Sequence, residues 1–174
     1  MFRLRGRRSY FHLPYEDEQY DVIGKKKAQA LAFSARHTKE TVAANVYNRA
    51  FNSSYTFGDG KEMISSTLPN VAGGTWSNRP TVYVDVSEAA LEQACIDIAK
   101  FTNDRGLKIQ VNPQKLIIPV ELQFEADRIL NSTKRVATPN NDKNSLGDSG
   151  RFPGGVKMNH YLTSTTAWFI RTDV

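Results

Sequence analysis

One long stretch with the periodicity of an α-helix, from about Glu16 to Phe51, constrains the fold more than any other feature of the sequence. Gly24 is a poor helix former and is expected to shorten the helix at its N-terminal end. A helix of ~30 residues spans about 45 Å, whereas a compact domain of this size has a radius of gyration of only about 16 Å. We therefore expect part of the helix to run along the surface or to project toward a partner. Apolar and small side chains recur at spacings of three, four or eight residues, which is typical of one helix face: Ile23, Leu31, Ala35, Thr38, Val42 and Val46.

The rest of the chain mixes helices and strands without strict alternation, which predicts an α+β fold. Ser87 is the expected N-cap of the second helix. A connection as long as residues 52–80 is unusual inside a compact domain and is often functional. The expected elements are helices at about 88–103 and 120–132, strands at 81–86, 115–119, 156–161 and 167–171, and loops at 52–80 and 133–155.

The positive charge is concentrated at the N-terminus. The chain has a formal net charge of +5, and its first eight residues include four arginines: Arg3, Arg5, Arg7 and Arg8. Such a segment binds nucleic acid or an acidic surface, or it is simply a solvated terminus, and the sequence leaves both readings open. No stretch approaches the ~20 apolar residues of a membrane span, so we expect no membrane partner.

No motif points to catalysis or to a bound cofactor. Cys95 lies on the apolar side of an expected helix, which is typical of a core residue. The stretch Phe57–Lys61 (FGDGK) departs from a phosphate-binding loop at two positions and is better explained as a tight turn. The histidines are far apart in sequence and lack a metal-ligand spacing: His12, His37 and His160. We therefore expect no catalytic residue, no cofactor, no metal and no small-molecule substrate.

Four segments, in order, resemble one family of proteins. They are ALAFSARHTKETVAANVYNRAF at 30–51, FGDGKEMISSTLPNVAGGTWSN at 57–78, DRGLKIQVNPQKLIIPVELQFEADRILNS at 104–132 and NHYLTSTTAWFIRTD at 159–173. Together they make the chain, from about Tyr15 to Val174, similar to the major capsid proteins of tailed bacteriophages, which have the Hong Kong ninety-seven type of shell fold.

The resemblance implies an architecture and a function. The long helix is expected to be the spine of a peripheral domain, which gives a basic segment at 1–15, a spine helix and long loop at 16–84, and a partial axial domain at 85–174. The implied function is a structural one, in which copies form pentamers and hexamers of an icosahedral shell that encloses DNA without reading its sequence. The protein is then expected in the virion, after synthesis in the cytoplasm of the bacterial host.

Contacts between subunits are expected on the spine helix and on the long loop. The predicted contact residues are Arg36, Lys39, Glu40, Phe57, Asp59, Lys61 and Trp76, and the predicted DNA contacts are Arg3, Arg5, Arg7 and Arg8. The charged residues of the helix are equally well explained as a solvated face.

The resemblance is partial, and other functions stay open. The family's N-terminal arm and extended hairpin have no counterpart in the first fifteen residues, and the strand expected at Ala167–Ile170 is followed by four residues only. We therefore expect a piece of a longer capsid protein, from a split gene, a misassigned reading frame or a degraded prophage copy. One alternative is the shell subunit of an encapsulin-like bacterial compartment, and another is a nucleic-acid-binding module that uses the basic N-terminus.

Overall fold

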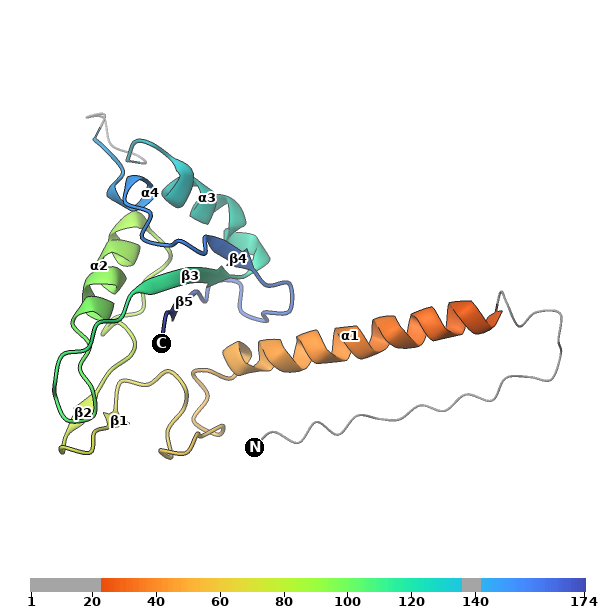
Figure 1. The fold of residues 1–174 in the computed structure, drawn as a ribbon, viewed down its shortest axis with the longest axis horizontal. Helices are drawn as coiled ribbons and strands as arrows, with labels where there is room; N and C mark the ends of the chain where they lie inside the picture. Colours follow the sequence, from red (N-terminus) through yellow and green to blue (C-terminus); the bar gives the residue numbers. More distant parts are fainter. Residues whose placement is uncertain (1–22, 136–141) are drawn as a thin grey trace. The chain divides into compact units, whose positions relative to one another are not determined.

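The computed structural model describes residues 23–135 and 142–174 and shows a chain of mixed helices and strands (Figure 1). The chain divides into two compact units, residues 1–41 and 42–174, and the boundary falls within helix α1. The larger unit contains a three-stranded sheet, a two-stranded sheet and the helices that follow α1. This mixture confirms the predicted α+β class, whereas the predicted peripheral and axial domains remain a prediction.

Helix α1 spans Lys25–Asn48, and its 24 residues extend over about 36 Å. Residues 23 and 24 form a π-helical turn that leads directly into α1, so only the α-helical hydrogen-bond pattern begins after Gly24. Residues 25–40 of α1 are all exposed. Residues 16–22 of the predicted helix lie outside the described residues.

The predicted end of the long helix at Phe51 is wrong, because the chain leaves the helix three residues earlier. Ala50 is fully buried, and its carbonyl accepts a hydrogen bond from the amide of Ile64 at 2.9 Å. A carbonyl bonded to a distant segment does not continue the helical ladder. Tertiary contacts at Ala50 therefore end the helix before its apolar periodicity ends.

The three-stranded sheet has β3 at its centre. Strand β3 (Pro113–Ile118) pairs in parallel with β4 (Val156–Met158) and antiparallel with β5 (Phe169–Thr172), so the order is β4-β3-β5. All three strands were expected from the sequence, although β4 ends three residues before the predicted position 161. It ends because Asn159 Oδ1 accepts a hydrogen bond from the amide of Tyr161 at 2.9 Å, which turns the chain.

Strand β3 contributes to a hydrophobic cluster on each face of the sheet. Leu116 and Ile118 lie in the larger cluster, whereas Ile117 between them lies in the smaller one with Ala50 and Phe169. This alternation is what the two-residue period of a strand produces. The larger cluster also contains Val86, Leu91, Ala126, Ile129, Leu146 and Phe152.

The remaining helices are shorter than the sequence predicted. Helix α2 spans Glu88–Ala99, and the hydroxyl of Ser87 caps it by accepting a hydrogen bond from Ala90 N at 3.2 Å, as expected. The region predicted as one helix at 120–132 is divided into a 3₁₀ turn at Val120–Leu122 and helix α3 at Gln123–Asn131. A short helix that was not predicted, α4, occupies Ser145–Asp148.

The prediction of a strand at 81–86 is wrong. Nothing in the described chain pairs with this segment as a neighbouring strand, although Trp168 Nε1 donates a hydrogen bond to Val84 O at 3.1 Å. The strand pattern in the sequence therefore lacks the partner that a strand requires. The loop predicted at 52–80 instead contains a small hairpin, in which β1 (Leu68–Pro69) pairs with β2 (Thr75–Trp76).

Hydrogen bonds join the residue directly before β3, Asn112, to the residue directly after β5, Asp173. Asn112 donates from its amide and its Nδ2 to the Asp173 carboxylate, at 2.9 and 3.0 Å, and Asp173 N donates to Asn112 O at 3.1 Å. The hydrogen bonds from Asn112 stabilise the charged carboxylate, so they hold the pKa of Asp173 below its usual range.

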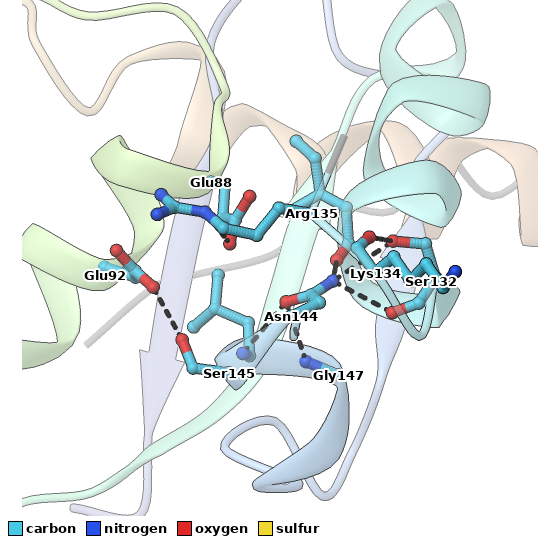
Figure 2. Close-up of polar contacts among 10 residues, drawn as sticks. Glu88, Glu92, Ser132, Lys134, Arg135, Asn144, Ser145 and Gly147 are labelled. Carbon is cyan, nitrogen blue, oxygen red and sulfur yellow. Dashed lines mark hydrogen bonds and ion pairs between the residues drawn. The ribbon is translucent and has the colours of Figure 1, made fainter. Parts of the chain in front are cut away.

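A buried asparagine connects the end of α3 to the start of α4 (Figure 2). Asn144 is fully buried, and its Nδ2 donates to the carbonyls of Ile129 and Ser132, the latter at 3.1 Å. Its Oδ1 accepts hydrogen bonds from the amides of Leu146 and Gly147 at 3.0 and 3.2 Å. One side chain thus satisfies both the last carbonyls of one helix and the first amides of the next.

Two polar contacts join the same region to α2 (Figure 2). Arg135 Nε lies 3.1 Å from Glu88 Oε1, and the hydroxyl of Ser145 donates to Glu92 Oε1 at 2.6 Å. A Cβ at Gly147 would lie 2.9 Å from Leu130 O, so only glycine lets α4 approach this closely. The end of the larger unit formed by α2, α3 and α4 is therefore held by specific polar contacts as well as by the core.

Replacing Asn144 with alanine is expected to lower the free energy of unfolding by about 2–4 kcal/mol, because the helix cap is lost and buried carbonyls lose their donor. Urea denaturation of the two proteins measures this difference. The matched control is Asn131→Ala, since Asn131 is exposed and makes only a 3.4 Å contact with Asp127. Equal destabilisation by both variants would contradict the role assigned to Asn144.

Candidate functional site

The long connection at 52–80 is ordered by one asparagine. Asn78 Nδ2 donates to Met63 O at 2.8 Å, and its Oδ1 accepts from Ser65 N at 2.9 Å. Ser65 is almost fully buried, so this bridge lies inside the connection. The backbone amide of Glu62, with a smaller contribution from the hydroxyl of Ser65, holds the pKa of the Glu62 carboxyl below its usual value. Asn78 therefore fixes the base of the hairpin formed by β1 and β2.

Three predicted contact residues lie in one tight turn of this connection. The amide of Phe57 donates to Lys61 O at 2.9 Å, and the amide of Lys61 donates to Asp59 Oδ1 at 3.1 Å. This is the turn predicted from the sequence, and the Asp59 carboxylate is used to stabilise the turn itself. Phe57 is about half exposed, so the turn presents an aromatic side chain to the surroundings.

An apolar groove of about 830 Å³ lies beside strand β5 in the unit of residues 42–174, and we call it the β5 groove. Trp76, another predicted contact residue, lines the groove and packs edge-on against Phe101 with ring centroids 5.6 Å apart. Strand β5 is one of the two outer strands of its sheet within the described chain. Other apolar residues that line the β5 groove are Phe51, Val82, Val84 and Trp168.

The charged contact residues predicted on α1 lie in the other unit. Arg36, Lys39 and Glu40 are all exposed, and none of them forms an ion pair with another described residue. The structure thus brings Phe57, Asp59 and Lys61 together in one turn and places Trp76 in the β5 groove. The arginines predicted to contact DNA, residues 3, 5, 7 and 8, lie outside the described residues.

Among the described residues, no group of histidine, cysteine and acidic side chains is arranged to hold a metal ion. Cys95 is half-buried, and burial raises the pKa of its thiol, so the side chain is disfavoured as a thiolate nucleophile. No helix in the described part of the chain is long and apolar enough to cross a membrane.

A family model for phage capsid proteins matches residues 13–174. The chain belongs to the phage capsid protein family. The predicted family is thereby confirmed, and the chain is a structural subunit of a phage capsid, a role that does not require catalysis. Membership in a capsid family implies self-assembly into a shell. Comparisons with curated proteins and with solved structures found no match.

The sequence indicated Asn70 and Asn78 as turn formers in the connection at 52–80, but it did not identify the backbone groups that they bind. Asn103, three residues before Gly106, was not singled out. Asn78 and Asn144 act on distant backbone groups, and nothing in their local sequence predicts those partners. The β5 groove was also missed, because it is assembled from segments far apart in the chain.

Replacing Asn78 with alanine is expected to loosen residues 52–80, because the Met63 carbonyl and the Ser65 amide lose their shared partner. We expect cleavage in this connection by a nonspecific protease to become at least several-fold faster, while unfolding of the larger hydrophobic cluster changes little. Timed proteolysis with mass spectrometry locates and measures the cleavage. Asn52→Ala is the control, since Asn52 is exposed and its side chain bonds only two residues away. Cleavage at the wild-type rate in Asn78→Ala would contradict this role.

Proposed function

We propose that this capsid protein associates with copies of itself into the pentamers and hexamers of an icosahedral shell that encloses DNA. The observation that carries the proposal is the family match over residues 13–174, which covers both units of the described chain. We further propose that the protein is made in the cytoplasm of a bacterial host and ends in the virion. DNA is enclosed without sequence readout.

The exposed surfaces of the chain support self-association. The stretch of α1 at residues 25–40 is exposed, and most of the stability of a helix in a protein comes from tertiary packing of one face. Leu31 and Phe33 project from this stretch with 40% and 73% of their surface exposed. Copies of the protein that cover such side chains would stabilise the helix and bury apolar surface.

The subunit contacts are proposed to include both sets of residues predicted from the sequence. On α1 these are Arg36, Lys39 and Glu40, whose mixed charges are available to pair with charges on a neighbouring copy. In the larger unit they are Trp76 and the turn at Phe57–Lys61. A subunit contact commonly has an apolar centre and a polar rim, and Phe57 and Trp76 in the larger unit offer apolar side chains for such a centre.

The purified chain is expected to form closed particles of uniform diameter at high protein concentration, because capsid contacts repeat the same patches under closed symmetry. Negative-stain electron microscopy measures the particles directly. Arg36→Glu combined with Lys39→Glu should reduce their yield, whereas restoring the positive charges should recover it. A protein that stays monomeric at every concentration and salt condition would contradict the proposed function.

Substituting alanine for the arginines at positions 3, 5, 7 and 8 is expected to weaken nonspecific binding to double-stranded DNA and to flatten its salt dependence. Each phosphate contact contributes about −0.9 to the slope of log K against log salt concentration. Fluorescence anisotropy over a series of salt concentrations measures both. The control substitutes Lys100, Lys108, Lys143 and Lys157, which are exposed and carry the same total charge. Equal losses in the two variants would show that total charge, not the N-terminal segment, determines DNA binding.

A further inference from the structure

Two turns from different parts of the chain lie side by side in the larger unit, and we call them the paired turns. They are residues 70–74, between β1 and β2, and residues 103–107, between α2 and β3 (Figure 1). The amide of Ala72 in the first turn donates a hydrogen bond to the carbonyl of Asp104 in the second at 3.1 Å. The paired turns therefore form one projection built from two segments.

Each of the paired turns is held in its conformation by an asparagine. Asn70 Oδ1 accepts from the amide of Ala72 at 3.2 Å, and Asn103 Oδ1 accepts from the amides of Arg105 and Leu107, both at 2.9 Å. Gly73, Gly74 and Gly106 have φ angles of 92°, 87° and 80°, which only glycine adopts without strain. Turns ordered in this way lose little conformational entropy when they bind a partner.

The paired turns carry large apolar side chains at their tips. Val71 is 82% exposed and Leu107 is 65% exposed. A single exposed aliphatic residue is ordinary on a protein surface. Here two of them occupy ordered turns that are hydrogen-bonded to each other, so the same rigid projection presents both.

The β5 groove offers a concave apolar surface in the same unit. Its volume of about 830 Å³ is several times the ~150 Å³ of a cavity that holds one benzene molecule, so it has room for more than one aliphatic side chain. Val82 and Tyr83 line the groove and are 69% and 80% exposed. Charges of both signs lie around it, at Arg79, Asp85, Asp97 and Arg171, and the paired turns also carry both signs, at Asp104 and Arg105.

The symmetry of a ring requires each copy to present two different contact patches. In a ring of five or six copies, every contact is heterologous, so a patch on one copy meets a different patch on the next. A chain that forms such rings must therefore present a pair of unlike, complementary surfaces. The projection of the paired turns and the β5 groove are a convex and a concave apolar surface on one chain.

We propose that the paired turns of one copy dock into the β5 groove of a second copy, with Val71 and Leu107 as the inserted side chains. This contact rests on the proposed self-assembly and assigns it a specific pair of surfaces. It orders copies head to tail, and repetition closes a ring where the rotation from one copy to the next divides a full turn evenly.

Two variants test the contact by sedimentation velocity. Val71→Asp with Leu107→Asp removes the apolar tips but leaves the groove, and Val82→Asp places a charge in the groove but leaves the tips. Each variant alone is expected to raise the protein concentration needed for assembly more than about tenfold. Mixed together, the two variants should form a one-to-one dimer that does not grow, because only one intact contact is available.

Phe124→Asp is the matched control, since Phe124 is 73% exposed on α3 and does not line the groove. This control should assemble as the wild type does, and thermal unfolding should be unchanged in all variants because each substituted side chain is exposed. Normal assembly of the tip variant, or a mixture that stays monomeric, would overturn the proposed contact while leaving self-assembly intact. Assembly lost equally in Phe124→Asp would overturn it as well. A wild type that never assembles would instead refute the proposed function, and this contact with it.

Discussion

The burial of strand β3 on both faces is the constraint on which the larger unit depends. Leu116 and Ile118 are completely buried on one face, and Ile117 is buried on the other. Each such side chain contributes roughly 1.5–3 kcal/mol when removed from water. Because one strand serves two clusters, the helices α2 and α3 and the turn after α1 are all positioned against the same six residues.

This arrangement also determines which surfaces are left for other molecules. The interior of the larger unit is concentrated around β3, so the hairpin of β1 and β2, the segment at 81–86 and the outer edge of β5 lie at its periphery. Asparagine side chains bond the base of the hairpin and the end of β5, and Trp168 Nε1 bonds the segment at 81–86. Ordered, exposed surfaces lose less conformational entropy on association, which favours the proposed subunit contacts.

Elements that depend on local sequence patterns were predicted correctly. Predictions were wrong where the structure depends on contacts between distant residues. The centre of α1, the cap at Ser87 and the position of β3 follow from helical periodicity, capping and a short apolar run. The early end of α1 could not be read in this way, because it depends on the contact between Ala50 and Ile64. The false strand at 81–86 has strand composition but no partner. Of the candidate site, the turn at Phe57–Lys61 was predicted, whereas the β5 groove depends on the tertiary fold.

Native mass spectrometry of the purified chain tests the central claim most directly, because it counts copies in each assembly. Five and six times the 19.6 kDa mass of one chain are the species predicted for a capsid protein that forms pentamers and hexamers. These species should lose single subunits on collisional activation, as ring assemblies of identical copies do. A spectrum that contains only the monomer, at concentrations where the protein remains folded, would contradict the account.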